Sequence, residues 1–416
     1  MTLAPVWRSR YLVLDQAVAS LSNFLLMVLV GRWLDPSDYG VFALIAASWL
    51  IVLGVADSAV VDPMMVMGEE PDGPGPHVTA ALVVGVAAAV VYALVAAGLG
   101  FTSDPAQTVL VLGIFLPSLV LQQLWRMIGF QRGRPLASVV NDSLFLLVQL
   151  VALGLAFGTG RFSEQAAAGC WGLGALAAAL LGFWQFRAGV GPLRRAFQVL
   201  HKGRAISDWL VLDFFVNRAG LKQLAMFVIA AVAGTQAIGA LQAVQNLMGP
   251  TNILLLGATS AALVRGGAEM RAGDEQGMLR TTRIHGLVLA VAVGLYCVAV
   301  SASAYWLIPA VYGHGYQAYV AVTPLVALQT LIYTLDVIPT TRLRIIRGTR
   351  LMFSTKVWLA PVCLVLVWAF SATLGTTGAG LAVVVLAVCS TGGAWIALHR
   401  AGHRPVTLRP AVVSEP

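Results

Sequence analysis

The chain has few charged residues and few histidines or cysteines for its length. Only 11% of its 416 residues are charged, whereas 59% are hydrophobic, and its mean hydropathy of +0.84 lies outside the usual soluble range. The six histidines are scattered and form no ligand set or catalytic triad. The four cysteines lie in apolar stretches without metal or disulfide spacing. The sequence therefore argues against a soluble enzyme and predicts no catalytic residue, metal or cofactor.

Long apolar runs are what the chain has instead. A helix needs about 20 apolar residues to cross the hydrocarbon core of a bilayer. We interpret twelve runs in this way, at residues 11–33, 41–61, 78–101, 106–130, 136–158, 163–186, 209–234, 236–263, 285–310, 318–341, 351–374 and 377–400. The predicted fold class is therefore an all-α polytopic membrane protein.

Lys and Arg outside these runs gather in alternate loops, chiefly at residues 132–134, 187–208, 265–283 and 342–350 and at both termini. Because positive loops stay in the cytoplasm, we expect both termini inside, in a bacterial inner membrane, and no nucleic-acid partner for the net charge of +8. The loop at 62–77 is an exception, with Glu69 and Glu70 but no cation. No cleavable signal is evident, so we expect the first run to remain as an anchor.

The second half of the chain repeats features of the first. The tetrapeptide LVLD at residues 12–15 recurs at 210–213, and Gly40 has a counterpart in Gly239. With six spans in each half, both copies keep one orientation, which is a parallel repeat. We therefore expect a lobe at 1–186, a basic amphipathic linker at 187–208, a second lobe at 209–400 and a cytoplasmic tail at 401–416.

Two cations lie within the seventh run. Arg218 and Lys222 are four residues apart and share one helix face. Each costs roughly 2.5–3.5 kcal/mol at the bilayer centre, so the pair is expected to line water or to meet anions. A cavity with this double charge would attract a phosphate or diphosphate. The alternative is a structural ion pair with Asp15 or Asp57.

Acidic and amide side chains within the runs suggest further sites. Burial makes Asp15, Asp57 and Asp213 candidates for binding a coupling proton or Na⁺, although capping or solvation at the inner interface also explains such acids. The remaining substrate-binding candidates are neutral amides that can hydrogen-bond sugar hydroxyls or neighbouring helices: Asn23, Asn217, Gln242 and Asn246.

The first 70 residues resemble a known family. The segment LVLDQAVASLSNFLLMVLVGRWLDPSDYGVFAL at 12–44, followed by DPMMV at 62–66, is similar to the opening of polysaccharide-exporting flippases. These belong to the multidrug/oligosaccharidyl-lipid/polysaccharide superfamily of MATE-like transporters. One departure is that the first run contains only acidic and neutral polar residues before Arg32.

The resemblance implies two six-helix bundles in a V around a central cavity, working by alternating access. The implied activity is flipping of a polyprenyl-diphosphate-linked oligosaccharide for cell-surface polysaccharide biosynthesis. The implied partners are that lipid-linked substrate, H⁺ or Na⁺ in antiport, membrane lipids and polysaccharide-synthesis proteins. A cation-coupled exporter of small amphipathic molecules is the alternative that Asp15 and Asp57 favour. A non-transporting scaffold is a third, and the cost of intramembrane charges argues against it.

Overall fold

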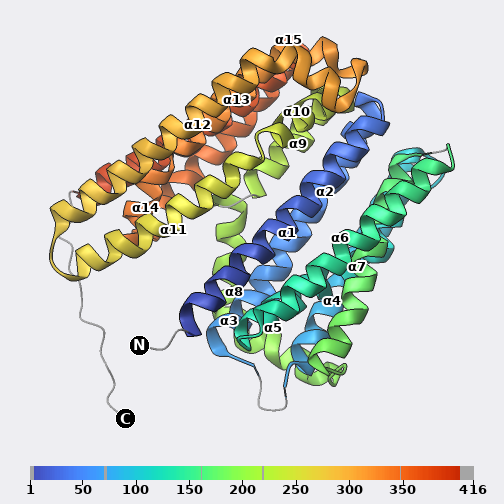
Figure 1. The fold of residues 1–416 in the computed structure, drawn as a ribbon, viewed down its shortest axis with the longest axis horizontal. Helices are drawn as coiled ribbons and strands as arrows, with labels where there is room; N and C mark the ends of the chain where they lie inside the picture. The colour runs from blue at the N-terminus through green and yellow to red at the C-terminus, as the bar shows by residue number, and fades with distance from the viewer. Residues whose placement is uncertain (1–3, 70–72, 161, 218–219, 347, 403–416) are drawn as a thin grey trace.

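The computed structural model describes residues 4–69, 73–160, 162–217, 220–346 and 348–402. These residues form helices joined by short turns (Figure 1). In chain order the helices are α1 (Ala4–Trp33), α2 (Pro36–Ala56), η1 (Asp57–Val61), α3 (Asp62–Met67), α4 (Gly75–Leu99), α5 (Asp104–Gln131), α6 (Pro135–Gly158), α7 (Glu164–Phe186), α8 (Leu193–Asn217), α9 (Gly220–Ala233), α10 (Thr235–Leu247), α11 (Pro250–Arg271), α12 (Glu275–Tyr312), η2 (His314–Val322), α13 (Thr323–Leu335), α14 (Val337–Ile345) and α15 (Thr349–Gly402).

The number of membrane crossings agrees with the sequence. Ten helices of the described residues are long and apolar enough to span a bilayer. Ile206–Val216 and Gly220–Ala233 together are long and apolar enough for an eleventh crossing, with a bend of 46° between them. α15 consists of two helices, because Gly375 at φ 55° and ψ −130° breaks it. Counting α15 twice gives about twelve crossings, and the predicted all-α polytopic fold is confirmed.

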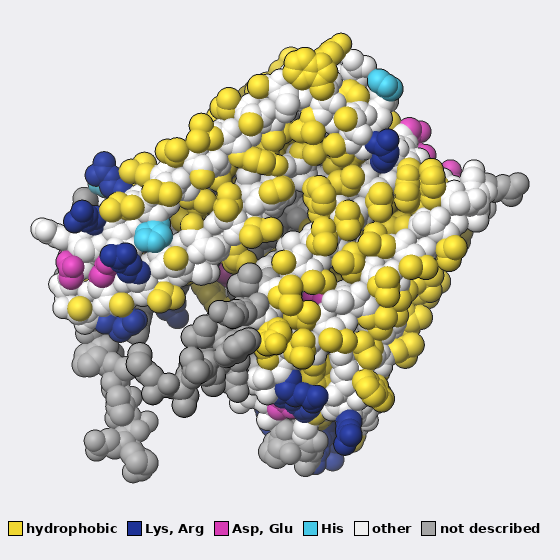
Figure 2. Space-filling view, in the orientation of Figure 1, with side chains coloured by type: hydrophobic (Ala, Val, Ile, Leu, Met, Phe, Trp, Pro, Cys, Tyr) yellow, Lys and Arg dark blue, Asp and Glu magenta, His cyan; other side chains and the backbone are white. Residues whose placement is uncertain are grey.

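The helices form two groups that diverge toward one end (Figure 1). α1 to α7 lie on one side, and α9 to α15 lie on the other. Lys and Arg side chains gather at the diverging end, whereas the flanks are mainly hydrophobic (Figure 2). We call this end, where Arg132, Arg134, Arg187 and Arg271 lie, the basic end. The hydrophobic flanks are the surface expected to face lipid.

Capping side chains fix where several helices start at the opposite end. Asp35 accepts hydrogen bonds from the backbone at the start of α2, where Pro36 is the first residue. Ser103 and Ser163 cap α5 and α7 in the same way. Each such cap is worth about 1 kcal/mol, so the helix starts are set locally by the sequence.

The two groups meet tightly at the end opposite the basic end. A Cβ atom added to Gly40 in α2 would overlap the backbone carbonyl oxygen of Thr235, and one added to Gly239 in α10 would overlap that of Pro36. The side-chain oxygens of Ser37 and Thr235 lie 2.9 Å apart. The two glycines matched by the sequence repeat are therefore a mutual crossing point of α2 and α10, which we call the glycine crossing.

Aromatic and arginine contacts reinforce this closure. The rings of Tyr39, Tyr312 and Tyr316 lie with centroids 5.5–6.3 Å apart, joining α2 to the α12–η2 turn. Arg32, at the end of α1, donates hydrogen bonds from Nη1 to the carbonyl oxygens of Ala310 and Val311 at 2.6 and 3.0 Å. The first half is thus held to the second half at this end.

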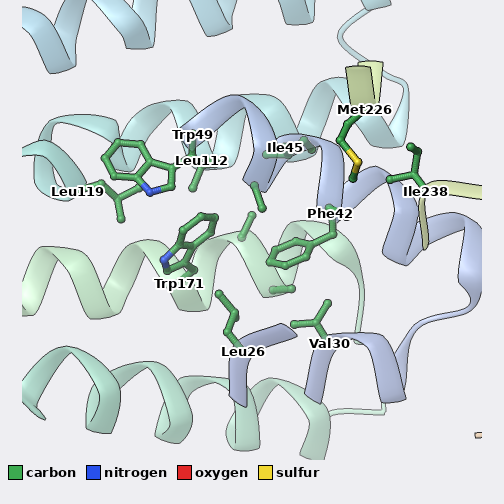
Figure 3. Close-up of a cluster of buried hydrophobic side chains, with 14 of the residues drawn as sticks. Leu26, Val30, Phe42, Ile45, Trp49, Leu112, Leu119, Trp171, Met226 and Ile238 are labelled. Atoms are coloured by element: carbon green, nitrogen blue, oxygen red, sulfur yellow. The ribbon is translucent and has the colours of Figure 1, made fainter. Parts of the chain in front are cut away.

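The buried core crosses the boundary between the halves. Phe42, Trp49 and Trp171 pack together in the first half, and Met226 of α9 and Ile238 of α10 lie beside them (Figure 3). Tight aromatic packing of this kind disfavours intermediate arrangements, because cores tolerate little change in volume. The end opposite the basic end, which we call the closed end, is therefore a packed interface rather than a loose contact.

Most of the segment predicted as a linker, residues 187–208, belongs to a longer helix. α8 starts at Leu193 and continues to Asn217, so residues 193–208 and the start of the seventh span form one helix. Ala196, Val199 and Gly203 are buried, because α8 packs on α4 and η1 of the first half. The break between α8 and α9 contains Arg218, which lies outside the described residues.

The acidic loop at 62–77 is partly helical and lies at the basic end. α3 continues the second span to Met67, and Glu69 then forms a bidentate ion pair with Arg132 at 2.6 and 2.8 Å. Hydrogen bonding to Glu69 raises the pKa of the Arg132 guanidinium. The carboxylate of Glu69 is therefore paired with an arginine of the neighbouring basic loop.

Candidate functional site

Two polar clusters lie within the membrane-spanning region, one in each half. The first is a pocket of about 370 Å³ in the second half, which we call the lysine pocket. Its lining comes from α8, α9, α10, α11, α13 and α15, with Asp336 between α13 and α14: Val216, Leu221, Lys222, Gln245, Met248, Thr251, Asn252, Leu255, Gln329, Thr330, Tyr333, Asp336, Lys356, Leu386 and Ser390.

Two lysines supply the positive charge of this pocket. Lys222 projects from the first turn of α9, and Lys356 projects from the first half of α15. Lys356 is only 5% exposed, and its Nζ lies 3.2 Å from Ser390 Oγ. Neither lysine forms an ion pair with a carboxylate among the described residues. With Asp336 in the same lining, the pocket holds two ammonium groups and one carboxylate, and the surplus positive charge favours binding of an anion.

Several polar atoms of the same pocket have no hydrogen-bond partner within the described protein. They are Gln245 Nε2, Gln329 Oε1 and Asp336 Oδ1, all buried. A buried polar atom without a partner costs about 1–3 kcal/mol, so such atoms are expected to meet water or a bound ligand. Donors and acceptors together suit a ligand that has both anionic and hydroxyl groups.

The second cluster, in the first half, is built around one arginine. Arg126 of α5 lies 2.7 Å from Asp15 Oδ2 of α1, and its Nε lies 3.5 Å from Asp142 Oδ2 of α6. Its Nη2 also donates to Gln16 Oε1 at 3.1 Å. Gln122 donates to Asp142 Oδ1 at 2.7 Å. Asp15 is 0% exposed, so the ion pair is fully withdrawn from solvent on its acidic side.

This aspartate cluster, defined as Asp15, Arg126 and Asp142, has one more carboxylate than guanidinium. With all three groups ionised its net charge is −1, and its other polar neighbours, such as Gln16 and Gln122, are neutral. A buried unbalanced charge is unfavourable, so binding of one proton or one monovalent cation would neutralise the cluster. A cavity of about 120 Å³ adjoins it, lined in part by Asn23, Arg126 and Asp142.

The remaining predicted acids lie near these clusters or apart from them. Asp57, in the π-helix η1, accepts hydrogen bonds from Gln123 Nε2 at 3.2 and 3.4 Å. Gln123 also lines the 120 Å³ cavity, which connects Asp57 to the aspartate cluster through one side chain. Single-turn π-helices inside α-helices are frequent at functional sites. Asp213 is partly buried in α8 and lines neither cavity.

The predicted amides are dispersed. Asn23 faces the cavity of the aspartate cluster rather than the lysine pocket. Asn246 donates to the Tyr312 hydroxyl at 3.2 Å and so serves the closed end. Gln242 does not line the lysine pocket, whose glutamines are Gln245 and Gln329. Asn217 ends α8, and its side chain lies outside the described residues, as does Arg218.

Three charged residues of these clusters were not singled out from the sequence. Arg126 and Lys356 lie within about six residues of the ends of their predicted spans, and Asp142 lies near the start of its span. Charges in such places are usually interpreted as reaching the interface. Asp15 pairs with Arg126 from its own half, so it does not form the ion pair with Lys222 that was the alternative to a cavity lining.

Comparisons with known proteins place the fold. No protein-family model matches the chain, and no curated protein matches its sequence. An inward-facing multidrug resistance MATE family transporter of the MOP superfamily aligns with a TM-score of 0.69 at 14% identity, covering 94% of this chain and 97% of that chain. The lipid II flippase MurJ in an inward closed conformation gives 0.73 at 10% identity, covering 94% and 87%. The eukaryotic MATE transporter AtDTX14 gives 0.61 at 14%, covering 95% and 99%.

The chain therefore has the fold that these transporters and the flippase share. The resemblance predicted from residues 12–66 is confirmed at the level of the fold.

Proposed function

We propose that this protein is an alternating-access transporter that flips a polyprenyl-diphosphate-linked oligosaccharide for cell-surface polysaccharide biosynthesis. The lysine pocket is the observation that supports this substrate class. Lys222 and Lys356 offer two positive charges to a diphosphate, and the unpaired amide and carboxylate atoms beside them suit sugar hydroxyls. The anion would sit in the pocket while the polyprenyl chain stays in lipid.

The closure at one end supports an alternating-access mechanism. The halves are joined at the glycine crossing and the tyrosine cluster, and they diverge at the basic end (Figure 1). We assign the basic end to the cytoplasm of a bacterial inner membrane, because positive loops remain inside. In this orientation the substrate would enter from the inner leaflet.

The orientation is testable by labelling. A cysteine placed at Arg194, an exposed residue of α8 at the basic end, should react with a membrane-impermeant reagent only after the cells are opened. Since the native Cys170, Cys297 and Cys363 are buried and Cys389 is partly buried, the unmodified protein serves as background. Labelling of intact cells at this position would contradict the assignment.

The lysine pocket predicts the effect of charge removal on binding. Lys222→Gln or Lys356→Gln should each weaken binding of a polyprenyl diphosphate with one sugar by about tenfold to a hundredfold, since a charge-assisted hydrogen bond is worth roughly 1.5–3 kcal/mol. Binding is measured with purified protein in nanodiscs, and transport by complementing a flippase-deficient strain. Arg265→Gln is the matched control, because it removes one positive charge from a side chain that is 70% exposed and outside the pocket.

Full binding and full complementation by the Lys222→Gln, Lys356→Gln double variant, at normal protein level, would refute the diphosphate assignment. Reduced protein level in either single variant would instead indicate a structural role. In that case, the affinity of the purified folded variant for the lipid diphosphate decides between a binding role and a structural role.

The aspartate cluster supports a second candidate function. Its net negative charge suits coupling to H⁺ or Na⁺, as expected of a cation-coupled exporter of small amphipathic molecules. The two candidates differ in their substrate. Cation-driven efflux of dyes and lipophilic drugs by proteoliposomes, together with no binding of the lipid diphosphate, would favour the exporter.

A further inference from the structure

A third cavity lies outside both clusters, on the flank of the first half at its basic end. Its volume is about 850 Å³. It is bounded by the start of α6, the end of α7 and Tyr11 of α1. We call it the lateral pocket. It shares no lining residue with the lysine pocket or with the cavity of the aspartate cluster.

Two arginines provide its charge, and no acid balances them. Neither Arg134 nor Arg187 forms an ion pair among the described residues. Arg134 lies 6.0 Å from the centre of the Phe186 ring and reaches the Gln185 carbonyl oxygen at 3.4 Å, which fixes the side chain but leaves other guanidinium donors available. No acidic residue lines the pocket, so its electrostatic character is positive throughout.

Arg187 has a backbone conformation that favours glycine. It ends α7 at φ 47° and ψ 38°, the one left-handed non-glycine residue in the described chain. Glycine is the common residue at this position of a helix end, because it has no Cβ to strain. Arginine brings no advantage to the turn itself. Its side chain lines the lateral pocket.

The outer wall of the pocket is apolar and faces the surface expected to contact lipid. Trp184 is 78% exposed, and Leu136 and Val140 are exposed beside it. Tryptophan concentrates at the membrane–water interface, with its ring at the level of the headgroups. The pocket thus brings two guanidinium groups together with an exposed apolar surface, which suit the phosphate and the acyl chain of a phospholipid.

We propose that the lateral pocket binds one anionic phospholipid, with the phosphate on Arg134 and Arg187 and an acyl chain along Trp184, Leu136 and Val140. Guanidinium groups match phosphate oxygens in pairs, and two of them suit a headgroup with more negative than positive charge. The pocket volume lies within the range of ordinary small-ligand sites, so it admits the headgroup and the first carbons of a chain. The bound lipid would hold α1, α6 and α7 together.

The experiment uses the full chain in detergent, with phosphatidylglycerol or phosphatidylcholine added. Phosphatidylglycerol should raise the unfolding temperature, and phosphatidylcholine should raise it much less. Arg134→Gln with Arg187→Gln should weaken the apparent affinity for phosphatidylglycerol by at least about tenfold. Arg194→Gln removes a charge from an exposed residue of the same end outside the pocket, and should leave the affinity unchanged.

Arg187→Gly separates lipid binding from a structural role. It relieves the left-handed strain, so the lipid-free protein should be as stable as the original or more stable, while the response to phosphatidylglycerol should fall. Unchanged response in the Arg134→Gln, Arg187→Gln variant would overturn the proposal. So would an equal stabilisation of the original protein by inorganic phosphate at the same concentration, because the pocket would then take a free anion.

Discussion

Replacing Gly40 by leucine is expected to abolish transport while leaving the protein in the membrane at near-normal level. Any side chain at Gly40 overlaps the backbone carbonyl of Thr235, and a backbone group of a packed helix cannot move aside. Overpacking costs typically about 1–3 kcal/mol, which at roughly 1.4 kcal/mol per tenfold disfavours the closed form by up to about a hundredfold. Leucine has three more carbons than alanine, so we expect its cost to lie at the upper end of this range.

The loss of transport should be specific to substitutions at the glycine crossing. Gly239→Leu should behave like Gly40→Leu, because its Cβ overlaps the backbone of Pro36 in the same way. Gly98→Leu in α4 is the matched control, since a Cβ there meets no atom within 4 Å. Transport by proteoliposomes and membrane content by immunoblot are the measurements. Full transport by Gly40→Leu would contradict the role of the crossing as a gate.

A complementary lock should act in the opposite direction. Ser37→Cys with Thr235→Cys places two thiols where side-chain oxygens lie 2.9 Å apart. Oxidation should stop transport by keeping the end shut, and a reductant should restore it. If this end is a gate that must both open and close, then Gly40→Leu, which keeps it from closing, and the disulfide, which keeps it from opening, should each stop transport.

Asp15→Asn is expected to remove the dependence of transport on the cation gradient, with protein level largely kept. The change leaves Arg126 with Asp142, so the aspartate cluster becomes neutral without any bound cation. Asp142→Asn should act alike, because Arg126 then keeps Asp15. Uptake at several imposed H⁺ and Na⁺ gradients is the measurement, and Asp208→Asn, at a side chain 69% exposed, is the control.

Removal of the arginine should have a different outcome. Arg126→Gln leaves two buried carboxylates without a cation beside them, and breaking a buried pair costs about 3–5 kcal/mol, so folded protein should fall sharply. Adding Asp15→Asn to Arg126→Gln should recover much of that protein. If the Asp15→Asn, Asp142→Asn double variant keeps its original gradient dependence, the cluster is not the coupling site.

The sequence predicted the features that depend on composition along the chain. Apolar runs of about 20 residues set the crossings, and the spacing of LVLD and Gly40 against their copies indicated the repeat. Lys222 was found because a cation in mid-span has no interfacial explanation. It does line a pocket.

The partners of the charges could not be predicted, because they depend on how helices pack. Arg126 and Lys356 lie near span ends, where a long side chain is usually taken to reach water. Only the tilt and contacts of α5 and α15 bury them beside Asp142 and Ser390. Likewise, the π-helix at Asp57 and the breaks at Gly375 and after Asn217 leave no hydropathy signal.

The glycine crossing has a geometry known from homodimers. Gly40 meets Thr235, and Gly239 meets Pro36, so the two contacts are reciprocal: each helix places a glycine against the first residue of the other. Such an isologous contact closes on itself and needs no second, complementary surface. A six-helix unit with this contact surface would be able to pair with an identical unit about a two-fold axis along the membrane normal. In this protein α8 joins the two groups of helices in one chain, so they need not be identical. One carries an arginine with two aspartates, and the other carries two lysines.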